Sequence, residues 1–204
     1  MNLYTEKNSA LLLIDHQVGT MQLVKNIPVE IVKRNALVLA KAARALRLPV
    51  VLTSSQEDKF QGPLVPELKE ILPEAFAARV KRAGIVNAWE DPNFSKAVRG
   101  TGRRNLIIAA VTTDICLVFP ALSARDEGYE VQAVIDACGS PFDISEEMAR
   151  RRMEKAGVVL TATNTLLAEL ASDWSRPEGV EIAKILMEDI LSSVLSNSVH
   201  AGVR

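Results

Sequence analysis

The stretch NLIIAAVTTDICLVFPAL, residues 105 to 122, decides how this chain folds. Its apolar run ends at Val111, two threonines and an aspartate follow, and Cys116 then opens a segment of helical character. A run that is apolar throughout, rather than alternating, is typical of a strand buried on both faces of a parallel sheet. The stretch therefore predicts a buried strand that turns into a helix, with a thiol at the junction.

Similar apolar runs recur along the chain and alternate with segments of helical periodicity. The further runs lie at 10–14, 48–55, 129–136 and 157–162, with a weaker one at 75–80. Helices are expected over 29–47, 91–102 and 143–157, with Asp91 ahead of Pro92 as the start signal of the second and Asp143 as the N-cap of the third. Strands that alternate with helices predict an α/β fold, a three-layer open parallel sheet with helices on both faces.

The composition is that of a soluble globular protein and argues against several other classes. The 204 residues are 48% hydrophobic and 24% charged, and the formal net charge is −1 with no long block of like charge. Nucleic-acid and membrane-surface binders draw affinity from a basic face, so neither partner is expected. Two cysteines make no disulfide scaffold, and the N-terminus lacks the features of a signal peptide. We expect a cytoplasmic protein.

Polar residues follow three of the predicted strands, at the edge where open α/β sheets bind ligands. These residues are Asp15, Cys116 and Asp136. At a helix start, capped by Thr113 or Asp114, backbone N–H groups would favour a Cys116 thiolate. A small buried core residue is the alternative interpretation of this cysteine. Asp15 is either a general base or, as is more common, a helix N-cap.

Other candidate residues are expected to be structural. His16 should point away from the side of Asp15, because neighbouring residues on a strand alternate in direction. Cys138 has no cap or cation nearby in sequence, and Pro120 should kink the helix behind Cys116. No metal-binding motif or phosphate-binding glycine loop is present, so neither a metal nor a cofactor is expected.

Four stretches resemble the isochorismatase-like cysteine hydrolase superfamily, over about residues 8 to 175. They are ALLLIDHQ (10–17), GPLVPEL (62–68), RAGIVNAW (82–89) and AAVTTDICLVFPALSARDEGYEVQAVIDACGS (109–140). The elements NAW and FPALSA resemble the YcaC-type subgroup. The resemblance implies a six-stranded sheet and a catalytic triad of Asp15, Cys116 and a cation. That cation is Arg82 by register, with the adjacent Lys81 as the alternative.

The resemblance also implies the chemistry of the site. A cis peptide bond before Thr112 would aim the N–H groups of Thr112 and Cys116 at one point, as an oxyanion hole. The implied activity is hydrolysis of a small amide-type substrate through a covalent thioester, without a cofactor. Vinyl-ether hydrolysis without a covalent step and a non-enzymatic, redox-sensing role remain alternatives. Proximity to the motifs suggests the substrate-binding residues Gln17, Asn87, Trp89 and Phe119.

The C-terminal part of the chain carries a wide apolar stripe beyond the segment that resembles the family. In residues 179–197, Ile182, Leu186, Ile190 and Val194 recur every four residues. We expect a hydrolase domain over 1–175 and a helical extension over 176–204 that joins subunits. The subgroup resemblance suggests a homo-octamer. Docking of this helix on its own domain is the alternative.

Overall fold

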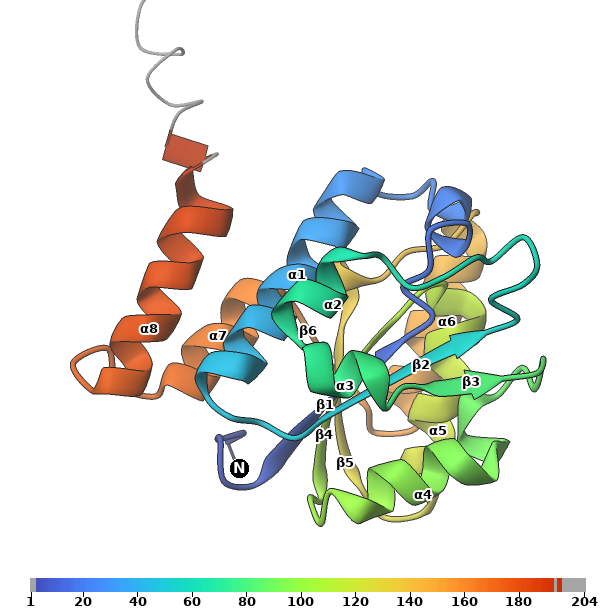
Figure 1. Ribbon diagram of the computed structural model, residues 1–204, viewed down its shortest axis with the longest axis horizontal. Helices are drawn as coiled ribbons and strands as arrows, with labels where there is room; N and C mark the ends of the chain where they lie inside the picture. The colour runs from blue at the N-terminus through green and yellow to red at the C-terminus, as the bar shows by residue number, and fades with distance from the viewer. Residues whose placement is uncertain (1–2, 193, 196–204) are drawn as a thin grey trace, which may run out of the picture.

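The computed structural model describes residues 3–192 together with 194 and 195. Its centre is one parallel six-stranded sheet, which confirms the predicted architecture (Figure 1). The strand order is β3-β2-β1-β4-β5-β6. The strands are β1 (Ser9–Ile14), β2 (Val50–Ser55), β3 (Val80–Arg82), β4 (Asn105–Ala110), β5 (Glu130–Val134) and β6 (Val159–Thr161).

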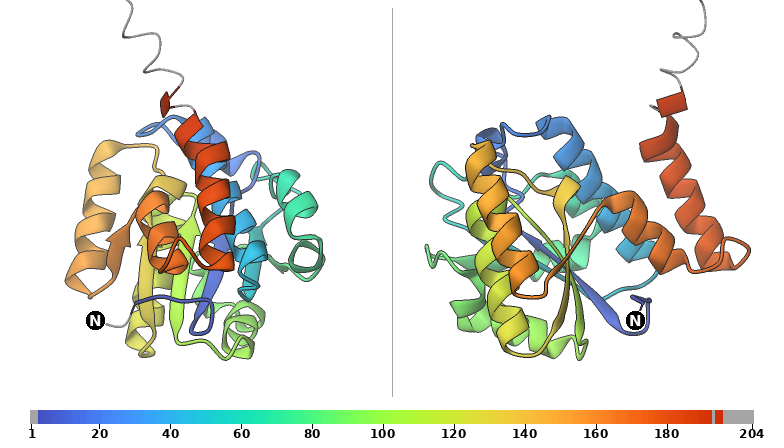
Figure 2. Two further views of the ribbon diagram at one scale, coloured as in Figure 1. Left: turned by 90° about the vertical axis from the view of Figure 1, so that its left-hand side faces the viewer. Right: turned by 180° about the vertical axis from the view of Figure 1, so that it is seen from behind.

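Helices cover both faces of the sheet, and Figure 2 shows the two layers on either side of it. One face carries α1 (Val29–Ala45), α2 (Glu67–Ile71), α3 (Pro73–Ala77), α7 (Thr163–Ala171) and α8 (Pro177–Leu186). The other face carries α4 (Pro92–Gly100), α5 (Val118–Asp126) and α6 (Asp143–Lys155). Short turns of helix are η1 (Thr20–Leu23), η2 (Ala88–Glu90), η3 (Thr113–Leu117), η4 (Ile135–Ala137) and η5 (Met187–Leu191).

The central strands β1 and β4 are buried along their whole length, as their unbroken apolar runs predict. From β1 the chain proceeds outward to β2 and β3, and from β4 it proceeds in the opposite direction to β5 and β6. The carboxyl ends of β1 and β4 therefore flank the point where the strand order reverses. This is the place where open α/β sheets form a crevice for ligands.

Three local expectations were wrong. The weak run at 75–80 is mostly helix α3, which Pro73 begins, and the third strand is a three-residue edge strand that starts at Val80. Asp91 does cap α4, but α6 has Phe142 at its N-cap position and no side-chain cap. The turn at Cys116 is a π-helix with Thr112 at its N-cap position, rather than a helix capped by Thr113 or Asp114.

The C-terminal helix α8 docks on its own domain, beside α1 and α7 (Figure 1). Its residues Ile182 and Leu186 are buried, and Lys41 of α1 donates to the carboxylate of Asp189 at 2.6 Å. The opposite side of the helix leaves Val180 and Met187 about half exposed. The alternative of docking in cis therefore holds for this helix, and its role between subunits stays a prediction.

Candidate active site

The first functional side chain, Asp15, lies where β1 ends. Its backbone has a φ of 59°, a left-handed conformation that is uncommon for residues other than glycine. The N–H of Asp15 still donates to the Thr53 carbonyl at 3.0 Å, so the residue stays tied to β2. Its side chain is only 4% exposed. The turn thus keeps the Asp15 side chain buried at the edge of the sheet where the parallel strands have their C-terminal ends.

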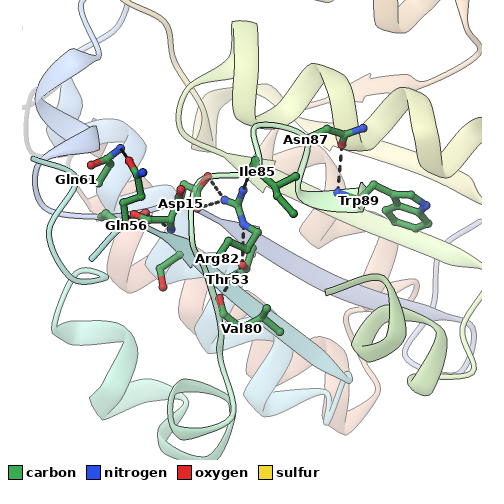
Figure 3. A network of polar contacts seen from close by, with 12 residues as sticks. Asp15, Thr53, Gln56, Gln61, Val80, Arg82, Ile85, Asn87 and Trp89 are labelled. Carbon is green, nitrogen blue, oxygen red and sulfur yellow. Dashed lines mark hydrogen bonds and ion pairs between the residues drawn. The ribbon is translucent and has the colours of Figure 1, made fainter. Parts of the chain in front are cut away.

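Arg82, at the end of β3, is the cation that meets this carboxylate (Figure 3). One terminal nitrogen of its guanidinium group contacts both oxygens of Asp15. The other donates to the Ile85 carbonyl at 2.7 Å, and Nε donates to Thr53 Oγ1 at 3.1 Å. The guanidinium side chain is 1% exposed. Its contacts fix both the position and the orientation of the Asp15 carboxylate.

Lys81 does not reach this site. Its side chain is 61% exposed, and Nζ pairs with Glu57 at 3.1 Å. Consecutive residues of a strand point to opposite faces, so the strand that turns Arg82 inward turns Lys81 outward. The geometry therefore favours Arg82, the residue matched by register, over its neighbour.

Cys116 lies half-buried in the π-helical turn η3, directly across from Asp15. The Asp15 carboxylate and the Thr112 N–H both lie close enough to the thiol to shift its pKa. The peptide bond between Val111 and Thr112 is cis, as the resemblance implies. Pro120 follows in α5, which begins only after the π-helical turn. The wide turn thus brings the thiol, the carboxylate and a backbone donor together.

Electrostatics keep this thiol protonated at rest. Burial raises the pKa of the Cys116 thiol well above its ordinary value, and the nearby Asp15 carboxylate raises it further. The Thr112 N–H opposes this shift without overcoming it. The expectation of a stabilised thiolate is not met, because burial and the Asp15 charge raise the pKa of the thiol above its ordinary value. Burial also raises the pKa of Asp15, against the opposing effect of Arg82.

A cavity of about 280 Å³ opens above these three side chains. Besides the side chains of Asp15, Arg82 and Cys116, the lining contains buried or half-buried polar residues and a group of exposed apolar residues at the mouth. The other lining residues are Gln17, Thr20, Leu23, Ser55, Gln56, Phe60, Gln61, Gly84, Ile85, Val86, Thr112 and Ile115. The volume suits a small molecule.

Gln17 is the one predicted substrate-binding residue that the structure places in this cavity. Its amide is already occupied, because Oε1 accepts from the Ser55 N–H at 2.8 Å. Its Nε2 donates to the Ser55 carbonyl at 2.8 Å and also to the Gly62 carbonyl. Gln17 therefore fastens both ends of the loop that follows β2, rather than presenting free donors to a ligand.

The other three predicted substrate-binding residues lie outside the cavity lining. Asn87 accepts from the Trp89 N–H at 3.1 Å and so caps η2, and Figure 3 shows the indole pointing away from Asp15. The Trp89 indole N–H donates to Glu127 at 2.7 Å. Phe119 packs under the guanidinium of Arg152. Nearness in sequence to the motifs therefore did not bring these three side chains into the cavity lining.

The sequence interpretation missed Gln56, Phe60 and Gln61, which line the cavity, and Thr53, whose hydroxyl oxygen accepts from Arg82 Nε. A signal for them existed. Residues 53–56 end the second predicted strand at the same edge of the sheet as Asp15.

His16 and Cys138 are structural, as predicted. His16 Nε2 lies 2.9 Å from the Ala137 carbonyl, and complete burial lowers the pKa of His16 to about 4. The Cys138 thiol donates to the Val134 carbonyl at 3.1 Å. Asp136 caps α7, since its carboxylate accepts from the N–H and hydroxyl of Thr163, both at 2.8 Å.

Among residues 3–192, 194 and 195, no group of three or more histidine, cysteine, aspartate or glutamate side chains is arranged to hold a metal ion. Within the same part of the chain, no helix is long and apolar enough to cross a bilayer.

Comparison with known proteins agrees with this geometry. The chain is 42% identical to the probable hydrolase YcaC of Escherichia coli over 169 residues, which cover 83% of this chain and 80% of that protein. A structure of YcaC from Pseudomonas aeruginosa, with hexane-2,5-diol and covalent acrylamide, matches with a TM-score of 0.89 and 40% identity over 98% of each chain. The Escherichia coli YcaC structure, an octameric hydrolase of unknown specificity, matches with a TM-score of 0.90 and 37% identity over 100% of this chain and 98% of that one. Residues 9–165 match the model of the isochorismatase domain, and the chain belongs to the isochorismatase family.

Proposed function

We propose that this protein hydrolyses the C–N bond of a small amide-type substrate, with Cys116 as nucleophile and Asp15 as general acid and base. The main support is the contact between the Asp15 carboxylate and the Cys116 thiol, with Arg82 holding the carboxylate from behind. A nucleophile, an adjacent base and a group that orients the base form the usual arrangement for covalent catalysis.

The reaction begins with transfer of the thiol proton from Cys116 to Asp15 as sulfur attacks the substrate carbonyl. The oxyanion accepts hydrogen bonds from the N–H groups of Thr112 and Cys116. Asp15 then gives its proton to the departing nitrogen, which leaves as an amine or ammonia, and a thioester remains. Asp15 next removes a proton from water, which attacks the thioester, and the proton finally returns to the Cys116 sulfur.

The raised pKa values suit this sequence of proton transfers. A protonated thiol beside a carboxylate provides the proton donor and the proton acceptor that the first step needs. The proton moves to Asp15 only as the sulfur attacks the substrate carbonyl. A peroxide-sensing cysteine depends on resting thiolate character. Burial raises the pKa of Cys116, which favours the hydrolase over the redox sensor. The relative that holds covalent acrylamide fits a nucleophile that small amides can reach.

A substrate panel tests the proposal. Amides, carbamates and nitriles are incubated with the full chain, and intact-protein mass spectrometry detects acyl-enzyme. The chain has two cysteines, so Cys138→Ala is a matched control for Cys116→Ala. We expect adducts and turnover in the Cys138→Ala variant but not in Cys116→Ala. Amide turnover that survives in Cys116→Ala would contradict the covalent mechanism, and a vinyl ether that this variant hydrolyses would point to vinyl-ether hydrolysis.

We further propose that the protein assembles as a homo-oligomer. The support is the octameric relative, which aligns along the whole of this chain, and the half-exposed apolar residues on the outer side of α8. Light scattering on the full chain measures the number of subunits.

A further inference from the structure

We propose that the substrate is uncharged and carries an apolar substituent, which lies between the five apolar side chains at the cavity mouth. This inference rests on the proposed function, and it names the class of molecule that the site selects. It follows from three independent features of the cavity: its charge, its mouth and the fixed loop after β2.

The described lining offers no unpaired cation to an anionic substrate. Asp15 and Arg82 are the charged residues in that lining, and they pair with each other. All three guanidinium nitrogens of Arg82 already donate to protein acceptors. A carboxylate or phosphate that entered would lose its hydration beside the Asp15 carboxylate without gaining a cationic partner, which is costly.

The mouth of the cavity is apolar. Five side chains form it: Leu23, Phe60, Ile85, Val86 and Ile115, with exposed fractions of 39%, 60%, 40%, 59% and 45%. Single exposed apolar residues are normal on a protein surface, but a group of them marks a binding site. These five come from four separate segments of the chain, which meet around the cavity that contains the thiol. An apolar group joined to the reacting carbonyl would remove their surface from water.

Phe60 is held in place although it is exposed. Gln17 binds the backbone at both ends of its loop, at Ser55 and Gly62. Gly19 lies so close that a Cβ atom there would be 1.8 Å from the Phe60 carbonyl oxygen. Its own N–H donates to the Gln61 carbonyl at 2.9 Å. The mouth is therefore a preformed surface, and binding it costs little ordering of the loop.

A pair of alkylating agents tests the charge selection without requiring turnover. Iodoacetamide and iodoacetate differ chiefly in charge, and peptide mass spectrometry of the full chain follows Cys116 and Cys138 separately. The ratio of the two rates for free cysteine is the reference. We expect the ratio of the iodoacetamide rate to the iodoacetate rate to be at least about tenfold larger for Cys116 than for free cysteine. This factor corresponds to a difference of about 1.4 kcal/mol in activation free energy. An equal or inverted ratio would overturn the inference and leave the covalent mechanism standing.

Chain length tests the apolar mouth. N-hexyl iodoacetamide should alkylate Cys116 at least about tenfold faster than iodoacetamide, since one methylene in an apolar pocket is worth about tenfold or more. Phe60→Ser should reduce this preference. Phe142→Ser is the matched control, because Phe142 is 66% exposed and lies outside the cavity lining. An unchanged preference in Phe60→Ser refutes the assignment.

Three further outcomes separate the inference from its alternatives. If Phe60→Ser keeps the preference but lowers the oligomer mass, the mouth is a contact with a second copy of the chain, and the inference is wrong. If the substrate panel gives turnover, butanamide should exceed succinamate, in which a carboxylate replaces the terminal methyl. If no amide reacts while the alkylation ratios hold, the proposed reaction fails and the selectivity of the cavity stands.

Discussion

Replacing Arg82 by methionine should destabilise the protein by an amount that depends on pH. The substitution removes the cation from a buried carboxylate, since the side chains of Arg82 and Asp15 are 1% and 4% exposed. Removing one partner of a buried ion pair costs about 3–5 kcal/mol, because the other charge stays buried without compensation. Two further hydrogen bonds, to Thr53 Oγ1 and the Ile85 carbonyl, are lost with the guanidinium.

The sign of the pH dependence follows from Asp15. Its folded-state pKa is already raised by burial, and Arg82 is the group that opposes this shift. Without Arg82 that pKa rises further above the unfolded value. Below the pKa of the unfolded chain, such a carboxyl group is protonated in both the folded and the unfolded state. Between the unfolded-state and folded-state pKa values only the unfolded chain loses this proton, so the free energy of unfolding falls as pH rises. The deficit of Arg82→Met should therefore be smallest near pH 4 and grow toward neutral pH.

Urea denaturation at several pH values, at one fixed protein concentration, measures this deficit against the wild type. The double variant Asp15→Asn with Arg82→Met removes the uncompensated charge, so it should be more stable at neutral pH than Arg82→Met alone. A deficit that is constant from pH 4 to 7.5, or a double variant no more stable than the single one, would refute a buried ion pair at this site.

Four further outcomes follow. Cys116→Ala should abolish hydrolysis while costing only about 1–2 kcal/mol in urea unfolding, and an unchanged rate would contradict its role. Asp15→Asn should slow turnover at least about a hundredfold in a steady-state assay, because an amide cannot accept the thiol proton; near-normal rates would contradict this. Gly19→Ala should lower the thermal midpoint, because its Cβ would meet the Phe60 carbonyl oxygen at 1.8 Å; an unaltered midpoint would show that the loop yields freely. Met187→Asp, on the outer side of α8, should reduce the mass in light scattering if that side joins subunits, and an unchanged mass would place the interface elsewhere.

Much of the fold could be predicted from the sequence, because the central strands are buried on both faces and must be apolar throughout. β1 and β4 satisfy this condition. The edge strand β3 does not, since Lys81 faces solvent and Arg82 faces the site, so no apolar run marks it. The weak apolar run at 75–80 lies mostly in helix α3, because apolarity alone does not separate a short helix from a strand.

The site was predicted less completely than the fold. Residues at strand ends, such as Asp15, could be placed because the ends of parallel strands share one edge. The direction of a side chain in a turn could not, and Trp89 accordingly lies against Glu127 instead of in the cavity. The ionisation state of Cys116 depends on burial and on Asp15, which are distant in sequence, so a local helix-start argument gave the wrong sign.

The division of the cavity between strand ends and loops has a consequence for how such a protein diversifies. Asp15, Arg82 and Cys116 are set by the sheet and the turn that leaves it, whereas the Phe60 side chain projects from a loop that the Gln17 amide and the Gly19 backbone hold through its main chain. A side chain on that segment can be exchanged without moving the reacting groups. Substitutions in this loop can therefore change which substrates enter the site while Asp15, Arg82 and Cys116 stay unchanged. Closely related proteins with the same three residues need not share a substrate.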